Sequence, residues 1–368
     1  MRILHVVRQF YPCIGGIENF VLCLSKEQLK LGHSVTVLTL NKNFADNTLL
    51  SLKDKLENIN IIRLPFWGSK RYPLAFSTIN YLRDYDLVHV HCVDFFVDYL
   101  VLLKPFHRKR IVLHTHGGFF HTEKYLLIKK IFFNLITRLI LKGCDKIIAD
   151  SSNDLIIFSK INKNIIQVDD GADVDKFNKI ERKVEPGYLL YIGRIDTHKR
   201  IDNLIKTVSI LVKKGLKIKL NIIGPDWKRI VPQLMELINK LDLAQYVKLL
   251  GKLSDQDLLN ETSKAHIFVS ASEYESFGIS AVEALAAGIP CVLNNIDSFK
   301  QFLDNQDCGN ITDFNNQQEA AAAIEKIINL NNDDYLRLSS NAKISAQRYA
   351  WKSVANKILS IYKETLNQ

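Results

Sequence analysis

The sequence lacks the features that define several large classes of protein. None of its six cysteines forms a CxxC pair, so we expect free thiols in a reducing cytoplasm rather than a structural zinc site or a disulfide framework. Residues 1–7 enter a short apolar strand without the long apolar region of a secretory signal. The most membrane-like stretch, residues 87–103, is interrupted by Asp94 and Asp98, and each acid at a bilayer centre costs about 2.5–3.5 kcal/mol. This stretch therefore predicts a strand followed by a buried helix.

Two nucleotide-binding fingerprints are also missing. Gly15-Gly16 lies where a first strand turns into a helix, but it is not a GxGxxG sequence and no acidic residue follows at the usual distance. A dehydrogenase is therefore disfavoured. A phosphate-binding P-loop is absent as well, because Gly251-Lys252 is followed by Leu253 and an earlier glycine is replaced by Tyr246.

What is present indicates an ordinary globular protein with two cores. The chain has 368 residues, of which 47% are hydrophobic and 24% charged, and its mean hydropathy is -0.02. At roughly 100–200 residues per domain, this length predicts two domains. A single small binding module, a disordered chain and a polytopic membrane protein do not fit this composition.

Positive charge is concentrated in the first half of the chain. The formal net charge is +10, with 49 basic and 39 acidic residues. Residues 1–180 contain 25 basic and 17 acidic side chains, whereas the remaining residues contain 24 and 22. We therefore expect an anionic partner to face the first half.

Short β-branched runs alternate with stretches of helical periodicity along the whole chain. This pattern is typical of parallel sheets covered by helices on both faces, so the predicted fold class is α/β with two doubly wound, Rossmann-like domains. Such sheets bind ligands beyond the carboxyl ends of their strands, and we expect a cleft there. The predicted strands are Ile3–Val7, Ser34–Thr39, Asn60–Leu64, Leu87–His91, Arg110–His114, Lys146–Ala149 and Ile165–Val168 in the first half, and Tyr188–Ile192, Lys217–Ile223, Val247–Leu250, His266–Ser270 and Pro290–Asn294 in the second. The periodicity lapses around residues 173–187, which predicts domains over 1–175 and 176–350.

The second half carries two charged motifs. The strand ending at Gly193 is followed by Arg194 and Lys199, which suit a diphosphate because arginine supplies a fork of donors and lysine a point charge. Glu275 and Glu283 bracket the Phe277-Gly278 turn at a predicted helix start, where carboxylates can bind sugar or ribose hydroxyls and free amides can bind phosphate. Separately, the cations could be solvated surface residues and either acid could be a helix cap.

Together these motifs, the Gly15-Gly16 turn and the stretch Asp86–His91 resemble the retaining glycosyltransferases of family 4, which have the GT-B fold. The resemblance covers nearly the whole chain, including a C-terminal helix, residues 351–368, expected to pack back on the first domain. It implies that Arg194 and Lys199 bind the donor diphosphate. The other implied roles are ribose binding by Glu283, contact with the transferred sugar by Glu275 and His116, and phosphate or nucleotide contact by Gly15, Gly16, Phe277 and Gly278.

The sequence departs from the family pattern at a few loop positions. Arg200 replaces the glycine that commonly follows the lysine, and Gly224-Pro225-Asp226 lacks a second glycine. Asp84-Tyr85-Asp86 and Asp173-Val174-Asp175 match a DxD metal motif, but we assign both to loops because that motif belongs with a different fold. We expect no cofactor and no essential metal, with Arg194 and Lys199 neutralising the diphosphate instead.

Residues 117–146 indicate which acceptor the protein uses and where it binds the membrane. Gly117–Thr122 and the basic, apolar stretch after it resemble the mannosyltransferases of xanthan and acetan assembly, which use GDP-mannose and a polyprenyl-diphosphate-linked acceptor. Lys124, Lys129 and Lys130, interleaved with large apolar residues, suit an anionic membrane surface, although charge runs are usually solvated helix faces. No nucleic-acid recognition module is found.

We therefore predict a cytoplasmic retaining glycosyltransferase, attached peripherally to the inner face of the membrane, that transfers mannose from GDP-mannose to a lipid-diphosphate-linked saccharide. A transferase that uses a UDP-sugar and a non-catalytic protein that only binds nucleotide sugar or membrane are the alternatives.

Overall fold

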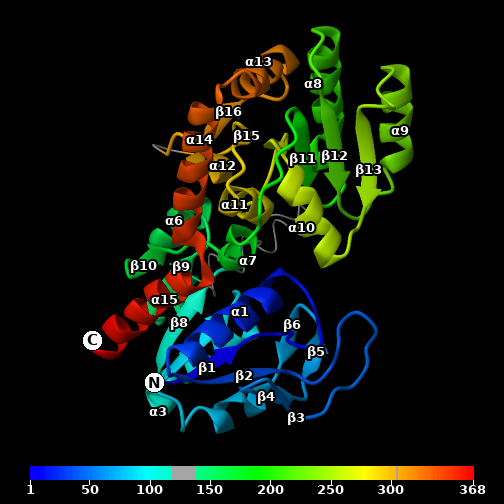
Figure 1. Ribbon diagram of the computed structural model, residues 1–368. Coiled ribbons are helices and arrows are strands. Elements are labelled where there is room, and N and C mark those ends of the chain that lie inside the picture. The colour runs from blue at the N-terminus through cyan, green and yellow to red at the C-terminus, as the bar shows by residue number, and fades with distance from the viewer. Residues whose placement is uncertain (118–137, 304–305) are drawn as a thin grey trace. The chain divides into compact units, whose positions relative to one another are not determined.

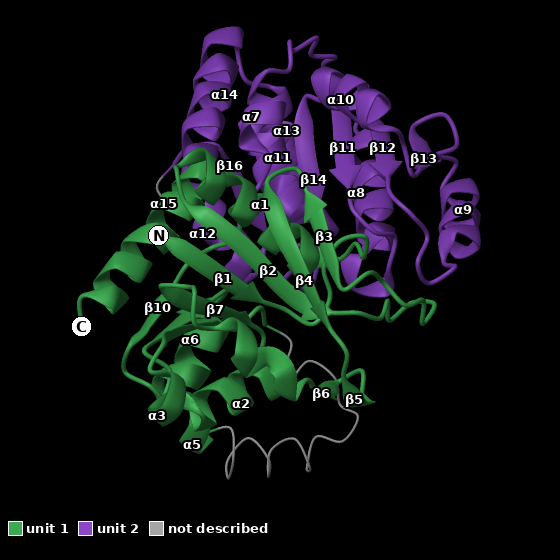
Figure 2. Cartoon of the chain, turned by 90° about the horizontal axis from the view of Figure 1, so that it is seen from below, with its two compact units in different colours: residues 1–170, 351–368 green, residues 171–350 purple. Residues whose placement is uncertain are grey.

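The computed structural model describes residues 1–117, 138–303 and 306–368 (Figure 1). The chain divides into two compact units. Unit 1 contains Met1–Asp170 and Trp351–Gln368, and unit 2 contains Gly171–Ala350 (Figure 2). Unit 2 is therefore an insertion between the last helix and the rest of unit 1.

Unit 1 is built on an eight-stranded sheet in the order β10-β9-β8-β7-β1-β2-β4-β3. All neighbouring strands are parallel except β3 and β4, which form an antiparallel edge. A separate hairpin, β5 and β6, lies outside this sheet. The strands are β1 (Arg2–Val6), β2 (Ser34–Leu40), β3 (Lys53–Leu56), β4 (Ile59–Leu64), β5 (Trp67–Ser69), β6 (Tyr72–Leu74), β7 (Leu87–His91), β8 (Arg110–His114), β9 (Lys146–Ala149) and β10 (Ile165–Gln167).

Successive residues of β1 pack into two different cores, which shows that the sheet of unit 1 is covered on both faces. Ile3 packs in the cluster formed with α1 and α15, whereas Leu4 packs in the cluster that contains α2. The described helices of this unit are α1 (Gly16–Lys30), η1 (Phe76–Tyr81), α2 (Phe95–Leu102), α3 (Lys104–His107), α5 (Arg138–Leu141), α6 (Ser152–Ser159) and α15 (Trp351–Leu366).

Unit 2 contains an entirely parallel six-stranded sheet in the order β13-β12-β11-β14-β15-β16. Its strands are β11 (Tyr188–Ile192), β12 (Lys219–Ile223), β13 (Val247–Gly251), β14 (Ile267–Ser270), β15 (Cys291–Asn294) and β16 (Gly309–Thr312). Its helices are α7 (Val174–Asn178), η3 (Thr197–Lys199), α8 (Ile201–Lys213), α9 (Val231–Lys240), α10 (Asp255–Lys264), α11 (Ile279–Ala286), α12 (Asp297–Leu303), α13 (Gln317–Ile328), α14 (Asn332–Ala346) and η4 (Gln347–Tyr349). Two apolar clusters again cover opposite faces of the sheet.

The two passages of chain between the units lie side by side at their unit 2 ends. The amide of Ala172 donates to the carbonyl of Tyr349 at 2.9 Å, and Ala172 forms a parallel bridge with Ala350. Residues 171–350 thus begin and end at one place in unit 2.

The predicted α/β fold class is confirmed, and every predicted strand is present with ends shifted by no more than two residues. The unit boundary follows Asp170 rather than residue 175, because Ala172, Val174 and Phe177 are buried in a core of unit 2. The sequence reading missed the edge strands β3 and β16 and the β5–β6 hairpin.

The membrane-like stretch of residues 87–103 is β7 followed by α2, as predicted. Asp94 caps α2 by accepting a hydrogen bond from the amide of Phe96, so a polar side chain marks the helix start. Among the described residues, no helix combines the length and apolar character that crossing a bilayer requires. The predicted basic helix lies mainly within residues 118–137, outside the described part of the chain.

Candidate active site

The predicted donor-binding residues of unit 2 lie at the carboxyl ends of its strands. Arg194 follows β11, Gly224 follows β12, and Glu275 follows β14. Because all strands of this sheet are parallel and β11 lies between β12 and β14, these loops emerge at the same edge. This edge is where an open α/β sheet binds ligands.

Two glycines allow the first two loops to approach each other. A Cβ atom on Gly224 would lie 1.9 Å from the carbonyl oxygen of Gly193, and Gly224 has a φ of +148°. A side chain is therefore excluded at Gly224 both by its backbone conformation and by the neighbouring carbonyl. The glycine that precedes Arg194 thus contributes to the packing of the loop.

Lys199 and Glu275 form the central charged contact of this edge. The Lys199 ammonium lies 2.6 Å from a carboxylate oxygen of Glu275, and the exposed fractions of the two side chains are 8% and 19%. The other Glu275 oxygen accepts a hydrogen bond from the hydroxyl of Ser272 at 2.9 Å. Both groups are thereby held in fixed positions while their pair remains partly open to solvent.

A second set of hydrogen bonds fixes the loops that carry this pair. The Asn294 amide donates to the carbonyl of Ser272 at 3.0 Å, and the amide of Glu273 donates to the carbonyl of His198 at 2.9 Å. Ser272 and Asn294 were not predicted. Asn294 is the last residue of β15 and Ser272 lies two residues after β14, so polar residues at the ends of neighbouring buried strands are the signal that could have identified them.

Arg194 is an exposed cation that rests on an aromatic ring. Its guanidinium carbon lies 4.6 Å from the centroid of the Trp227 ring, in a loop after β12. A stacked guanidinium keeps its donors at the edge of the plane free for a carboxylate or phosphate. Trp227 was not predicted as a site residue. Its ring holds the Arg194 guanidinium in place at the carboxyl ends of the strands.

Arg200 has a backbone conformation that glycine adopts more readily. Its φ is +47°, in the left-handed region that favours glycine. Its side chain forms ion pairs with Asp202 and Glu273, which connect the start of α8 to the loop after β14. These contacts offset part of the backbone cost and place a third cation beside Lys199.

Glu283 lies on the second turn of α11, and the charged groups that act on it are Asp173, Lys176 and Asp255. Gly278, the residue before this helix, has a φ of +110°, and Phe277 is buried in the core below it. Burial, followed by the negative charge of Asp173, raises the pKa of Glu283 to about 8. This carboxyl therefore holds a proton at neutral pH in the unliganded unit.

The raised pKa of Glu283 predicts a pH-dependent stability. Between pH 4.5 and about 8 the folded chain holds a proton on Glu283 that the unfolded chain has lost, so the free energy of unfolding falls as pH rises. Glu283→Gln removes this dependence, and we expect its melting temperature relative to the unsubstituted protein to rise from pH 5 to about pH 8 and to level off by pH 9. Thermal unfolding across this range measures the difference. Exposed Glu236 on α9 provides the control variant Glu236→Gln, and parallel curves for Glu283→Gln would contradict the prediction.

In unit 1 the structure brings the start of α1 close to the end of β8. Gly15 caps α1 and Gly16 begins it, and Phe20 on the next turn packs edge-on against the ring of His116, with centroids 4.9 Å apart. The predicted residues Gly15, Gly16 and His116 thus gather at the carboxyl edge of the unit 1 sheet.

Gly16 is not required by the fold. Nothing lies within 4 Å of the position that a Cβ atom would occupy, and its φ is not positive. Gly16→Ala should therefore leave the melting temperature unchanged, while transfer activity falls because the added methyl group blocks the approach of a ligand to the helix start. Calorimetry and a transfer assay separate the two effects. Unchanged activity would remove Gly16 from the site.

Both ring nitrogens of His116 already have partners. Its Nδ1 lies 3.3 Å from Oδ2 of Asp150, and its Nε2 lies 2.8 Å from Nδ1 of His91. Neither partner was predicted as a site residue, although His91 ends the stretch Asp86–His91 that contributes to the family resemblance. Asp150 directly follows β9 and His91 ends β7, so polar residues at neighbouring strand ends were again the available signal.

Unit 1 places several groups of histidine and aspartate side chains within reach of a common cation. One such group is His91, His114 and His116. We assign no metal to them, because His91 and His116 are hydrogen-bonded to each other and Nε2 of His114 lies 2.5 Å from a carboxylate oxygen of Asp150. The two DxD motifs are only partly in loops, since Asp175 lies within α7. The expectation that no metal is essential stays a prediction.

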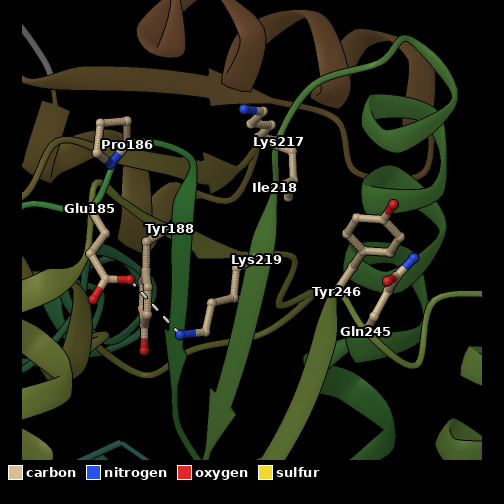
Figure 3. Close-up of a pocket in the computed structure, with 8 residues that line it drawn as sticks. All are labelled: Glu185, Pro186, Tyr188, Lys217, Ile218, Lys219, Gln245 and Tyr246. Atoms are coloured by element: carbon tan, nitrogen blue, oxygen red, sulfur yellow. Dashed lines mark ion pairs between the residues drawn. The ribbon is translucent and has the colours of Figure 1, made fainter.

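The described residues of unit 2 form surface hollows at both edges of its sheet. One, of about 630 Å³, is lined by His198, Arg200 and Glu273 beside the Lys199 loop. The other is shown in Figure 3 and lies where β11 and β12 begin, so it is at the opposite edge of the sheet from Lys199. Its lining residues are Glu185, Pro186, Tyr188, Lys217, Ile218, Lys219, Gln245 and Tyr246. We place no ligand there.

The two doubly wound units, with cations and acids at the carboxyl edge of the second sheet, define a glycosyltransferase of the GT-B fold. The model for "Glycosyltransferase Family 4" matches residues 14–158, and the model for "Glycosyl transferases group 1" matches residues 173–345. The structure is similar to that of a glycosyltransferase from Rickettsia africae, with a TM-score of 0.76 and 21% sequence identity. The alignment covers 100% of this chain and 99% of the Rickettsia chain.

Sequence relatives place the chain more narrowly. It is 33% identical over 372 residues to a protein of Xanthomonas oryzae named GDP-mannose:cellobiosyl-diphosphopolyprenol alpha-mannosyltransferase, covering 100% of this chain and 97% of that protein. A protein of the same name from Komagataeibacter xylinus is 30% identical, with coverage of 100% and 94%. The chain belongs to the family 4 glycosyltransferases.

Proposed function

We propose that this enzyme is a retaining α-mannosyltransferase that moves mannose from GDP-mannose to a saccharide linked to a polyprenyl diphosphate. The observation that carries the proposal is the full-length similarity to mannosyltransferases named for this donor and acceptor. The paired Lys199 and Glu275 and the stacked Arg194 support the part that concerns the donor.

The reaction exchanges one bond at the anomeric carbon for another. The bond from this carbon to the donor diphosphate breaks and its electron pair leaves with the diphosphate. The acceptor hydroxyl attacks from the same face, and its proton passes to the departing diphosphate oxygen. The donor configuration is thereby retained, and no protein group needs to act as an obligatory base or nucleophile.

Positive charge in unit 2 stabilises the leaving group. Negative charge grows on the diphosphate as the bond breaks, and the Lys199 ammonium and Arg194 guanidinium are cations at the edge where the diphosphate would bind. Glu275 holds Lys199 in position and offers its carboxylate to sugar hydroxyls, while Glu283 is assigned to the ribose. His116 is assigned to sugar positioning.

Transfer assays test the proposal. Purified protein is incubated with radiolabelled GDP-mannose and polyprenyl-diphosphate-linked cellobiose, and the lipid-linked product is identified by its mass and anomeric configuration. We expect an α-linked mannosyl product. A β-linked product would remove the same-face mechanism, preference for a UDP-sugar would change the donor, and no transfer with any nucleotide sugar would favour a binding protein.

We also propose that unit 1 attaches peripherally to an anionic membrane at the cytoplasmic face. Its helices α2, α3 and α5 lie close together (Figure 2). They carry apolar side chains exposed to solvent, with Leu102 at 69%, Phe106 at 80% and Leu139 at 67%. Arg108 and Arg138 lie next to them in sequence. Apolar side chains beside cations suit a surface of acidic lipids.

Sedimentation with liposomes tests this attachment. We expect the protein to bind vesicles containing phosphatidylglycerol in a salt-sensitive manner, and to bind neutral phosphatidylcholine vesicles weakly. Phe106→Ser should weaken binding, whereas Ile344→Ser, at an exposed apolar position of unit 2, should not. Equal binding to both kinds of vesicle, or to neither, would remove the proposal.

A further inference from the structure

A row of buried histidines runs through the unit 1 sheet on the face that packs against α1 and α15. His89 and His91 on β7 and His114 on β8 follow the alternation of a strand, and His5 lies on the neighbouring β1, so these side chains share one face. His116 follows β8 and has a φ of +52°. The members of this histidine row are His5, His89, His91, His114 and His116. The rings of His114 and His116 are stacked and those of His89 and His91 are tilted, with centroids 4.2 Å apart in each pair.

Three members of the row link a buried amide to a carboxylate through consecutive contacts. The side-chain oxygen of Gln28 lies 2.8 Å from Nε2 of His5. Nδ1 of His5 lies 2.9 Å from Nε2 of His91, and Nδ1 of His91 lies 2.8 Å from Nε2 of His116. Nδ1 of His116 then faces Oδ2 of Asp150 at 3.3 Å. We call this series the Gln28–Asp150 chain.

The protons of this chain can be counted from its two ends. The Gln28 oxygen only accepts, so Nε2 of His5 carries a proton and its Nδ1 accepts from Nε2 of His91. Nδ1 of His91 is then an acceptor as well, and it needs a proton on Nε2 of His116. At the other end, Oδ1 of Asp150 lies 2.5 Å from Nε2 of His114, and Oδ2 of Asp150, which faces Nδ1 of His116, needs a proton on that nitrogen. Both ends therefore demand a proton on the same ring.

We infer that His116 is held as an imidazolium cation, with one N–H donated to His91 and the other directed at Asp150, and that Gln28, His5 and His91 are positioning residues that set this state. The consequence for catalysis rests on the proposed function. A substrate group that reaches His116 meets a positive charge and no free ring N–H. The residue therefore acts through its charge, and not as a base.

The surroundings of His116 balance this charge. Asp150, Asp154 and Asp170 face it from the segments after β9, in α6 and after β10, whereas His91 and His114 are its neighbours on β7 and β8. Although burial lowers the pKa of His116, the carboxylates raise it further, and the net result is above the ordinary value. Burial lowers the pKa of the other four members of the row, which keeps them neutral.

The spacing of the nitrogens favours a proton over a metal ion. Two nitrogens bound to tetrahedral zinc at 2.0–2.1 Å lie about 3.3 Å apart. The His5–His91 and His91–His116 contacts of 2.9 and 2.8 Å are instead within the range of N–H···N hydrogen bonds. A single shared proton therefore fits each contact.

The ionisation of His116 can be read directly by nuclear magnetic resonance. The full-length protein is labelled with ¹⁵N-histidine, long-range ¹H–¹⁵N correlations are recorded from pH 5 to pH 9, and the His116 signals are assigned by their loss in His116→Gln. We expect both ring nitrogens to show imidazolium shifts at pH 7. Asp150→Asn should make His116 neutral at this pH.

A second variant acts on the far end of the chain. Gln28→Leu removes the acceptor that orients His5, so the hydrogen bonds can reverse and His116 no longer needs two protons. We expect the titration midpoint of His116 to fall by at least about one pH unit, a tenfold change in proton affinity. His33→Gln, a partly exposed histidine of unit 1 outside the row, is the matched control and should leave the midpoint unchanged.

Two results would overturn the inference. One is an unprotonated ring nitrogen on His116 at pH 7 in the unsubstituted protein. The other is a set of histidine signals that changes when EDTA is added, which would mean that a metal ion occupies the place of the shared proton. Neither measurement requires mannosyl transfer. If the protein transfers mannose while His116 is neutral, only this inference is wrong. If His116 is a cation and no transfer occurs, only the proposed function is wrong.

Discussion

Lys199→Ala is expected to lower the turnover number by about 10²- to 10³-fold, with a smaller change in the KM for the donor. The reason is that the Lys199 ammonium is nearly buried and opposes charge that grows only as the diphosphate departs. Steady-state kinetics with GDP-mannose measures both parameters. An unchanged turnover number with a raised KM would show that Lys199 contributes only to ground-state binding.

The ion pair with Glu275 requires controls for this experiment. Removing Lys199 leaves a partly buried carboxylate without its cation, and Glu275→Gln separates that effect from the loss of the ammonium itself. Lys214→Ala, which breaks a surface ion pair with Glu325 elsewhere in unit 2, should leave turnover unchanged. Arg194→Ala should also lose well over tenfold, whereas Glu283→Ala should chiefly weaken nucleotide binding.

Gly224→Ala is expected to destabilise unit 2 by roughly 3 kcal/mol. The added methyl group would meet the carbonyl oxygen of Gly193 at 1.9 Å, and the φ of +148° is accessible almost only to glycine. Because the two residues carry adjoining loops, relief of the clash must move the backbone that precedes Arg194. Activity should therefore fall even in the fraction that remains folded.

Unfolding of unit 2 can be followed by its own fluorophore. Trp227 is the only tryptophan in residues 171–350, so urea denaturation of a chain with Trp67→Phe and Trp351→Phe reports on this unit. Gly215→Ala is the matched control, since its φ is +83° but nothing lies within 4 Å of the added atom, and a cost of only about 1–2 kcal/mol is expected. Equal losses for both variants would show that the close approach contributes nothing.

The fold could be predicted because its strands are buried on both faces. Apolar strands such as residues 219–223 alternate with amphipathic helices along the chain. This alternation is typical of parallel sheets covered by helices on both faces. The missed strands are at sheet edges. β3 reads Lys53–Leu56 and is mostly exposed, so its sequence carries charge where a central strand carries apolar residues.

The candidate site was predictable where its chemistry is local in sequence. Arg194 and Lys199 share one loop, and Glu275 and Glu283 bracket one turn. Pairing across strands was not visible in the same way. The contacts of His91 with His5 and His116 depend on which strands are neighbours and in which register, and no spacing along a single segment encodes that arrangement.

The inserted position of unit 2 has a consequence for biosynthesis. Residues 1–170 leave the ribosome without α15, whose Tyr362 hydroxyl is hydrogen-bonded to Nδ1 of His89 within the histidine row. Unit 2 is continuous in sequence, so all of its segments have been synthesised before α15 and its core can form first. Until Trp351–Leu366 emerges, this face of the first sheet is covered by α1 without α15, and part of the histidine row is exposed to water. The domain that is synthesised first therefore completes its folding last. A truncation that removes only α15 should destabilise unit 1, although most of unit 1 lies at the other end of the chain.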